Sequence, residues 1–540
     1  MWQQNYTPLA DSLPVSALAA ALPIFVLLFL LGVARKPAWI AGLSGLGAAV
    51  LVAMFAYGMP AGLVFGSVTY GAAFGLLPIG WIVYWAIVLY RVAYETGKFE
   101  IIKDSVGGLS SDRRLQALLI AFSFGAFIEG AAGFGTPVAV AAAMLAGLGF
   151  SPFYAAGICL LANTAPVAFG SIGIPIFTLA GITGLPLLDL SANVGRICAP
   201  VSLFVPAYLV FVMGGLKALK GVLPAALVCG GGFALTQFYV SNYLGPQLTD
   251  ISASLVAIAS LVLLFNVWKP KDKFELEGAA KGHMPAKHAA GDVILAWSPY
   301  LLLVVMVLLW GQESFKAVLN KVTINIEWPM LHGMVERVQP LVAKPSPYPA
   351  VYTFNWLSAA GTACLVSSLL AALALRMRPG QYVGVLIHSA KQLFLSLVTI
   401  AAVLGLAFLM NYSGATVTLG LAFAATAGLF PFFSSLLGWL GVFLTGSDTS
   451  ANALFGNLQV VTATKLNLNP SLMAAANSSG GVMGKMISLQ SIAVAAAATG
   501  MPASDEAKLF RFTLRHSILL ASVIGLISVF YAYVAPQLAR

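Results

Sequence analysis

Two carboxylate residues stand inside long apolar stretches of the chain, and both have the chemistry to bind a proton reversibly. Glu129 lies in FIEGAAGFGTP at 127–137, and Asp448 lies in FLTGSDTSANA at 443–453. Ionisable residues are costly in hydrocarbon surroundings, where they mark the path of an ion, a proton or a substrate. A carboxyl whose access to water changes can bind and release a proton. We therefore predict proton-coupling roles for both residues. Glu129, which has fewer polar neighbours, is the stronger candidate, and Asp448 has the alternative role of capping a half-helix.

The same two stretches contain residues that interrupt helices and expose hydrogen-bonding groups. Glycine-rich backbone inside an apolar run breaks a helix, and the freed polar groups need a cavity or a protein interior. Interrupted segments at corresponding places in two halves of a chain are the best sequence indication of a transporter's binding site. The candidate substrate-binding residues in these stretches are Gly130, Gly133, Gly135, Thr445 and Ser447.

An amide residue followed by a hydroxyl residue comes after each stretch. Asn163 and Thr164 begin the motif NTAPVAFG, and Asn477 and Ser478 begin the motif NSSGGVMGK. Asparagine and hydroxyl side chains donate and accept hydrogen bonds, so they can contact both a carboxylate and an alcohol. We predict that these four residues also bind the substrate.

Two cations are candidates for pairing with an anionic substrate. Lys485 closes the motif NSSGGVMGK inside an apolar run, and we expect it to be the substrate's charge partner. Its alternative is to extend its head group to the membrane interface. Arg196 opens a predicted span, where substrate binding and interface anchoring both remain open. Its planar guanidinium suits a carboxylate well.

The composition restricts the class of protein. The chain has 540 residues, of which 60% are hydrophobic and 9% charged, and its mean hydropathy is +0.92. Soluble proteins carry roughly 25% charged residues, so the sequence predicts an all-α polytopic membrane protein embedded in a lipid bilayer. The net charge of +10 is spread over short loops. This pattern fits anchoring at the cytoplasmic side and excludes nucleic acid as a partner.

Enzymatic and ATP-driven classes do not fit. An intramembrane aspartyl protease needs two catalytic aspartates, and no second mid-span aspartate accompanies Asp448. The nucleotide-binding pattern GxxxxGK[ST] does not occur, and the four cysteines lack metal-ligand spacing. We therefore predict a transporter and not an enzyme, with no metal and no cofactor apart from a coupling proton.

Hydropathy predicts about 12 spans plus two re-entrant hairpins, because a crossing helix needs about 20 residues and the two carboxylate stretches are longer. Two crossings should be broken, at 163–173 and 477–485. The predicted division is a first half at 1–268 with hairpin 115–148 and broken helix 152–190, a cytoplasmic linker at 269–291, and a second half at 292–540 with hairpin 433–466 and broken helix 470–500.

The register of the motifs indicates an inverted repeat. The same order of hairpin, asparagine motif and returning span in both halves predicts two copies of opposite orientation. Basic loops then fall on one side, which places both termini in the periplasm. Residues 61–76 are short for a span, residues 415–430 should lie on the surface without crossing, and residues 312–352 should form a long loop.

At these motifs the sequence resembles the bacterial L-lactate permease family. The motifs are FGAFIEGAAGFGTPVAVAAAMLAGLGF at 124–150, NTAPVAFG at 163–170, WLGVFLTGSDTSANALF at 439–455 and GKMISLQSIA at 484–493. The resemblance covers essentially the whole chain. It implies symport of L-lactate with a proton across the bacterial inner membrane, with glycolate and D-lactate as related substrates.

The asparagine motifs are also similar to those of the wider ion-transporter superfamily of dicarboxylate carriers, where they line the substrate and cation sites of an elevator-type domain. Ala162 and Ala476 replace the serine that precedes asparagine in that superfamily, which argues against sodium binding. The alternatives are a sodium-coupled di- or monocarboxylate carrier and a channel. The preferred hydroxy acid, the proton stoichiometry, the oligomeric state, and elevator against rocking motion stay open.

Overall fold

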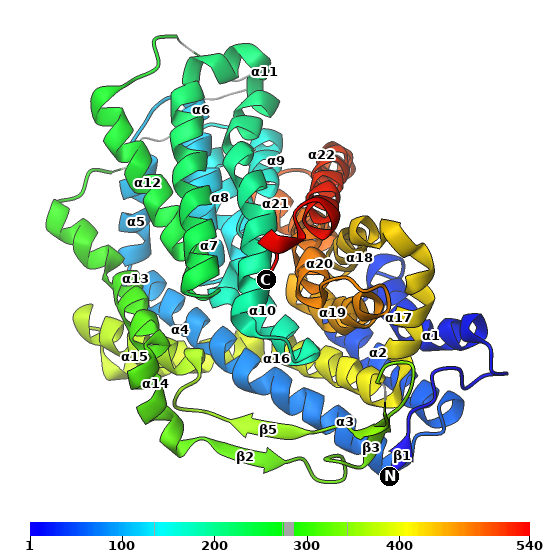
Figure 1. Ribbon diagram of the computed structural model, residues 1–540. Coiled ribbons are helices and arrows are strands. Elements are labelled where there is room, and N and C mark those ends of the chain that lie inside the picture. The colour runs from blue at the N-terminus through cyan, green and yellow to red at the C-terminus, as the bar shows by residue number, and fades with distance from the viewer. Residues whose placement is uncertain (134, 273, 275–285, 343) are drawn as a thin grey trace.

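The computed structural model describes residues 1–133, 135–272, 274, 286–342 and 344–540. The described chain is built almost wholly from helices (Figure 1), and eleven of its helical stretches are long and apolar enough to cross a membrane. The prediction of an all-α polytopic membrane protein is confirmed. The predicted linker at 269–291, including Lys273 and Lys281, lies largely outside the described residues.

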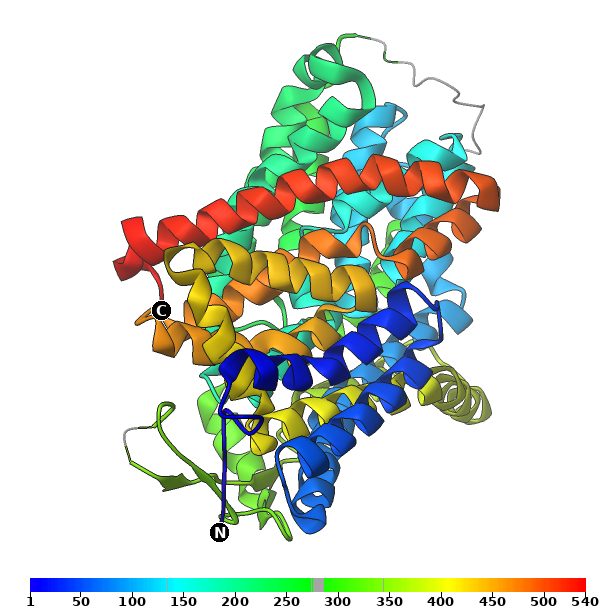
Figure 2. The ribbon, with the colours of Figure 1, turned by 90° about the vertical axis from the view of Figure 1, so that its right-hand side faces the viewer.

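Five long helices form one body, here called the long-helix body (Figures 1 and 2). They are α1 (Leu13–Gly32), α2 (Ala38–Leu51), α3 (Ala61–Phe74), α4 (Trp81–Glu95) and α16 (Pro379–Ser413). Small residues let these helices approach closely. A Cβ at Gly71 of α3 would lie 2.5 Å from the carbonyl oxygen of Leu404 in α16. Two further helices, α13 (Ala290–Gly311) and α15 (Ala360–Ala374), pack beside α4.

The short segment at 61–76 does not stand alone. Helix α3 continues through the π-helical segment η2 (Gly75–Gly80) into α4, and the backbone leaves helical geometry at Leu77. Residues 61–95 therefore follow one kinked path.

The first predicted hairpin is present between the surface helix α5 (Lys98–Gly107) and helix α9 (Pro152–Ala162). Its first arm runs through α6 (Arg113–Gln116), η3 (Ala117–Phe124) and α7 (Gly125–Ala131), and its second arm is α8 (Thr136–Gly147). The arms pack against each other. The chain reverses at Gly133 and Gly135, whose φ angles of 58° and 82° lie in the left-handed region that glycine adopts without strain.

The second hairpin is formed by α18 (Phe430–Thr445) and α19 (Asp448–Lys465). Its tip is Gly446, which has a φ of 70°, followed by Ser447. The Ser447 Oγ accepts a hydrogen bond of 3.2 Å from the Ser450 N–H, so Ser447 caps α19. Helix α17 (Ala415–Phe423) and the segment η6 (Ala424–Leu429) precede this hairpin. With nine residues, α17 is shorter than the roughly 20 that a crossing needs.

The first broken crossing matches its prediction, whereas the second breaks later than expected. Helix α9 (Pro152–Ala162) and the segment from η4 (Val167–Phe169) through α10 (Gly170–Thr183) meet at a bend of 64°. In the second half, α20 (Pro470–Lys485) is helical throughout and α21 begins at Leu489 (Leu489–Thr499). The break predicted at 477–485 is wrong, because the chain leaves the helix only after Lys485.

Close packing explains the glycines that suggested a break within α20. A Cβ at Gly480 would lie 1.9 Å from the carbonyl oxygen of Ser435, and one at Gly484 would lie 2.3 Å from that of Trp439. A Cβ at Gly438 of α18 would lie equally close to the carbonyl oxygen of Asn477. These glycines let α18 and α20 pack backbone to backbone, as small residues do between membrane helices.

Three further helices complete the second body: α11 (Leu187–Tyr243), which is interrupted at Gly214 and Gly215, α12 (Thr249–Val267) and α22 (Ala503–Val529), followed by η7 (Phe530–Val534) and η8 (Pro536–Leu538). The hairpins, broken helices and these three helices are here called the hairpin body. Figure 2 shows it above the long-helix body.

The loop at 312–352 contains local structure that hydropathy could not predict. It comprises α14 (Glu313–Leu319) with η5 (Asn320–Val322) and the strands β2 (Ile324–Glu327), β3 (Val335–Arg337) and β4 (Ser346–Pro347), and β5 (Val351–Phe354) follows. Strand β2 pairs antiparallel with β5. The N-terminal strand β1 (Trp2–Gln3) pairs with β3, so the N-terminus lies at the same end of the molecule as this loop (Figure 1).

Candidate functional site

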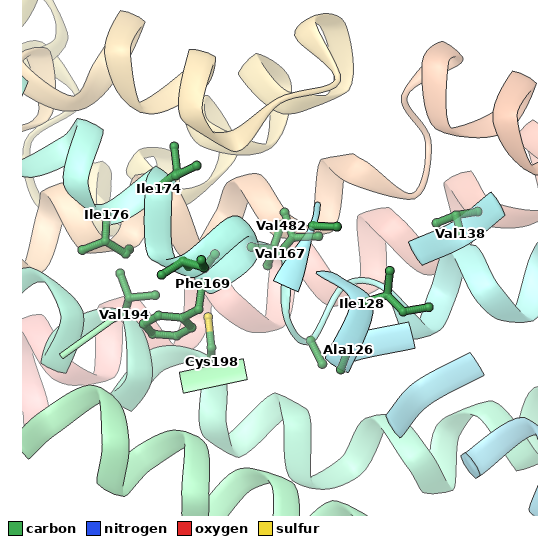
Figure 3. Close-up of a cluster of buried hydrophobic side chains, with 14 of the residues drawn as sticks. Ala126, Ile128, Val138, Val167, Phe169, Ile174, Ile176, Val194, Cys198 and Val482 are labelled. Carbon is green, nitrogen blue, oxygen red and sulfur yellow. The ribbon is translucent and has the colours of Figure 1, made fainter. Parts of the chain in front are cut away.

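A cavity of about 150 Å³ brings Glu129, Asp448 and Lys485 together. It lies where the tip of the second hairpin, the start of α10 and the end of α20 meet. The exposed fractions of the three residues are 5%, 3% and 9%, so all three charged groups are buried. Figure 3 shows a cluster of buried apolar side chains from α7, α8, η4, α10, α11 and α20, and α7, α10 and α20 also supply residues that line the cavity. Electrostatic interactions are strong in such apolar surroundings.

Asp448 is held by a hydrogen-bond network on one side only. Its Oδ2 accepts from the Ser478 hydroxyl at 2.6 Å and from the Asn452 amide at 3.3 Å. Asn452 in turn accepts from the Asn477 amide at 3.0 Å. The Oδ1 atom has no partner within the described chain, and Gly481 makes room for it, since a Cβ there would lie 2.3 Å away. One oxygen is fixed, and the other is left for a proton or a ligand.

Lys485 ends α20 and points into the cavity. Its Nζ donates a hydrogen bond to the carbonyl oxygen of Gly446, at the tip of the second hairpin. Glu129 and Asp448 both interact with it electrostatically. A lysine ammonium has three donors, and Gly446 is its one hydrogen-bond partner in the described structure. The ammonium can therefore serve two carboxylates or an incoming anion.

Glu129, in α7, is packed against glycine backbone. A Cβ at Gly170 would lie 2.5 Å from the Glu129 Oε1, and one at Gly133 would lie 3.5 Å from the same atom. The Oε2 atom lacks a hydrogen-bond partner of good geometry within the described chain, and the side chain of Asn163 interacts with this carboxyl. Buried polar groups without partners are rare in folded proteins, and here they lie beside the cavity.

A strained turn at the start of α10 contacts the tip of the first hairpin. Ser171, Ile172 and Gly173 have φ angles of 47°, 60° and 77°, which is uncommon for non-glycine residues and most unusual for a β-branched one. The Ser171 hydroxyl donates a 3.0 Å hydrogen bond to the carbonyl oxygen of Ala132 at the hairpin tip. Backbone strain of this kind concentrates at functional sites.

The opposite wall of the cavity belongs to the long-helix body. Helix α1 and the residue that begins α2 supply apolar side chains, and α16 supplies two hydroxyl groups and two apolar side chains. The residues are Leu27, Leu31, Ala38, Ser396, Thr399, Ile400 and Val403. The charged residues and their partners all come from the hairpin body, so the site lies at the boundary between the two bodies.

A second, larger cavity of about 970 Å³ adjoins the first. The two share five lining residues, namely Leu31, Ala38, Thr445, Gly446 and Gln490. The larger cavity is bordered by Arg35, Lys36 and Arg511. It therefore connects the site to the end of the molecule that carries these basic residues.

Several predicted site residues lie away from the 150 Å³ cavity. The two hydroxyl residues predicted near the second tip, Thr445 and Ser447, do line the cavity, whereas two of the predicted glycines do not. Gly130 packs against Asp250 and Ile251, and Gly135 lines another cavity, of about 810 Å³.

The predicted hydroxyl and amide residues mostly act behind the cavity. The Thr164 hydroxyl bonds to the carbonyl oxygen of Leu161 within its own turn, at 2.7 Å. Asn477 and Ser478 support Asp448 from behind and do not line the cavity.

Arg196 is not brought to the cavity. Its guanidinium donates to the Asn242 side chain at 2.8 Å and to the carbonyl oxygen of Leu538 near the C-terminus. It therefore ties α11 to the end of the chain.

No local sequence pattern indicated several residues that the structure places at or beside the site. Ser171, Gln490, Ser396 and Thr399 line the cavity, but each is an ordinary polar residue in its own segment. Asp250 begins α12 and packs behind Glu129. Only the three-dimensional fold shows that it is buried.

The arrangement suits a small anion and a proton. The cavity is below the roughly 300–1,000 Å³ typical of pockets for drug-sized ligands. It offers one ammonium, two carboxyls with unpartnered oxygens and the hydroxyls of the second hairpin tip. In the described part of the chain, no group of three or more His, Cys, Asp or Glu side chains could hold a metal ion.

These features define a multi-pass membrane permease, and the comparisons identify its family. The L-lactate permease family model matches residues 16–535, and the chain belongs to that family. It is 47% identical to the glycolate permease GlcA of Escherichia coli K12 over 99% of this chain and 98% of the relative. It is 46% identical to the L-lactate permease of Bacillus subtilis 168 over 98% of both chains.

Among solved structures, the chain is similar to the YdaH transporter of Alcanivorax borkumensis. The TM-score is 0.47 at 14% identity, and the match covers 87% of each chain.

Proposed function

We propose that this permease imports L-lactate, with glycolate and D-lactate as related substrates, by symport with a proton across the bacterial inner membrane, and that both termini face the periplasm. The observation that carries the proposal is the buried cavity that Lys485 lines together with Glu129 and Asp448, with both of which it interacts electrostatically. The names of the L-lactate and glycolate permeases to which the chain is similar support the substrate class.

Charge balance in the cavity supports proton coupling. An unpaired buried charge is costly, so the positive Lys485 requires one of the two carboxyls to be ionised while the site is empty. When a substrate carboxylate enters and pairs with Lys485, the second negative charge becomes unfavourable. A proton then has to bind to the ionised carboxyl. Substrate and proton thus stabilise each other in the site, and this mutual dependence is what symport requires.

The remaining groups fit the rest of a 2-hydroxy acid. The Ser447 and Thr445 side chains and Gln490 line the cavity, and their donors and acceptors suit an α-hydroxyl. The apolar side chains of Leu27, Leu31 and Val403 lie on the opposite wall and suit the methyl group of lactate. The small volume favours short acids, which is consistent with relatives named for lactate and for glycolate.

The position of the site supports a movement of one body against the other. All charged groups belong to the hairpin body and the opposite wall belongs to the long-helix body. The larger cavity leads from the site to Arg35, Lys36 and Arg511. We assign this basic end to the cytoplasm, which makes the present arrangement the inward-facing one in our proposal. Sliding of the hairpin body would close this path and open the other.

Uptake of labelled L-lactate into proteoliposomes tests the proposal. An imposed inward proton gradient should drive accumulation with or without sodium, and Glu129→Gln should abolish accumulation while keeping exchange of labelled for unlabelled lactate. Glu100→Gln, in the surface helix α5, is the matched control. Accumulation that follows a sodium gradient and ignores pH would favour the sodium-coupled carrier. Lactate that only equilibrates across the membrane, and never reaches a higher concentration inside than outside, would favour a channel.

A further inference from the structure

A second buried carboxylate lies behind Glu129. Asp250 is 1% exposed and stands in the first turn of α12. A Cβ placed on Gly130, the residue after Glu129, would lie 2.8 Å from the Asp250 Cβ, so α7 and α12 are in direct contact at this point. Glu129 and Asp250 also interact electrostatically.

Asp250 has no conventional structural partner. Neither of its carboxyl oxygens has a hydrogen bond within the described chain, although first-turn aspartates usually bond to free backbone N–H groups. The charged groups of the site differ in whether they interact with Asp250. Lys485 interacts with Glu129 and Asp448, whereas the groups that face Asp250 are Glu129 and the Cys198 thiol. A carboxylate so buried and unpaired is very unfavourable, so Asp250 needs a proton whenever Glu129 is ionised.

We propose that Asp250 forms a coupled proton-binding pair with Glu129, in which Glu129 exchanges protons with the cavity and the two carboxyls share the proton that the pair retains. Glu129 lines the cavity and Asp250 does not, so Glu129 is the member of the pair that meets the cavity. Two carboxyls that interact in this way titrate as one unit. The inference rests on the proposed proton symport and assigns the pair as its coupling group.

The pH dependence of transport tests this pairing. Asp250→Asn keeps the size of the side chain and removes its exchangeable proton and its charge. When the retained proton is on Glu129, Asp250 carries the negative charge of the pair and opposes ionisation of Glu129. In Asp250→Asn this opposition is lost, so Glu129 keeps its proton less readily. Half-maximal proton-driven uptake should therefore move by roughly one pH unit or more toward acidic pH, while lactate exchange at acidic pH stays close to wild type. Asp189→Asn, at the first turn of α11, is the matched control and should leave the profile unchanged.

A double-mutant comparison separates coupling from a structural role. In Glu129→Gln, lactate exchange should retain a pH dependence that the additional Asp250→Asn change removes, whereas two independent residues would give additive effects. If Asp250→Asn does not reach the membrane, Asp250→Ser removes the carboxyl without adding volume beside Gly130. A wild-type pH profile in Asp250→Asn or in Asp250→Ser, whichever variant reaches the membrane and accumulates lactate, would overturn the inference. Failure of wild-type protein to couple lactate to protons would instead refute the proposed function.

Discussion

The contact between Gly170 and Glu129 offers the sharpest test of how the proton-binding carboxyl is positioned. Gly170 has φ −61° and ψ 155°, which any residue adopts, so Gly170→Ala introduces no backbone strain. The new Cβ would lie 2.5 Å from the Glu129 Oε1. Ordinary contact begins near 3.4 Å, so the carboxyl has to move by about 1 Å. A misplacement of that size can cost roughly 100-fold in activity.

We therefore expect Gly170→Ala to reach the membrane and to lose about 100-fold in the initial rate of proton-driven lactate uptake. Gly147→Ala is the matched control, because a Cβ there meets no atom within 4 Å. Shortening the acid by one methylene should restore space, so Gly170→Ala with Glu129→Asp should lose less than the product of the two single effects. Wild-type uptake by Gly170→Ala would refute the assigned position of Glu129.

Three further changes probe the charge partner, the helix packing and an ion pair outside the site. Lys485→Met should remove lactate binding, measured by isothermal titration calorimetry, because it deletes the ammonium that lines the cavity. Retained affinity would assign the anion elsewhere. Gly480→Ala places a Cβ 1.9 Å from the Ser435 carbonyl oxygen. This overpacking should destabilise the protein by about 3 kcal/mol, measured as a lowered Tm in detergent. An unchanged Tm would contradict the close packing. The Arg114 guanidinium, 2.7 Å from the Asp272 carboxylate, lowers the pKa of Asp272, so this pair stabilises the fold above the ordinary aspartate pKa of about 4 and loses its effect as pH falls through the lowered value. Asp272→Asn should therefore reduce Tm at pH 7 and have little effect near pH 3, and equal effects at both would contradict the assignment.

Much of the architecture could be predicted because the hydrocarbon layer imposes strong rules on sequence. Apolar runs located the helices, and the glycines at 133 and 135 marked a tip whose left-handed backbone requires them. The same signal misled in α20. Gly480 and Gly484 serve the approach of α18 and do not break the helix. A glycine's sequence context does not distinguish a turn from a close helix contact, because both need only the absence of a Cβ.

The candidate site was predicted where a charge was buried in an obviously apolar run and missed where the partner came from afar. Glu129, Asp448 and Lys485 were recognisable because each ionisable group carries a large cost in such a run. Asp250 was not, because its burial depends on the packing of α12 against α7. Arg196 looked suitable by charge alone, yet it pairs with Asn242 and the C-terminal segment. Pairings between segments hundreds of residues apart leave no local pattern.

Proton movement driven by lactate tests the central claim most directly. Proteoliposomes with a trapped pH indicator, no imposed pH gradient and sodium-free buffer would receive L-lactate on the outside, with a potassium shunt to remove any membrane potential. Symport requires the interior to acidify as lactate enters, at a rate that Glu129→Gln abolishes and Glu100→Gln preserves. Lactate entry without acidification, or acidification unchanged in Glu129→Gln, would contradict proton coupling through this cavity.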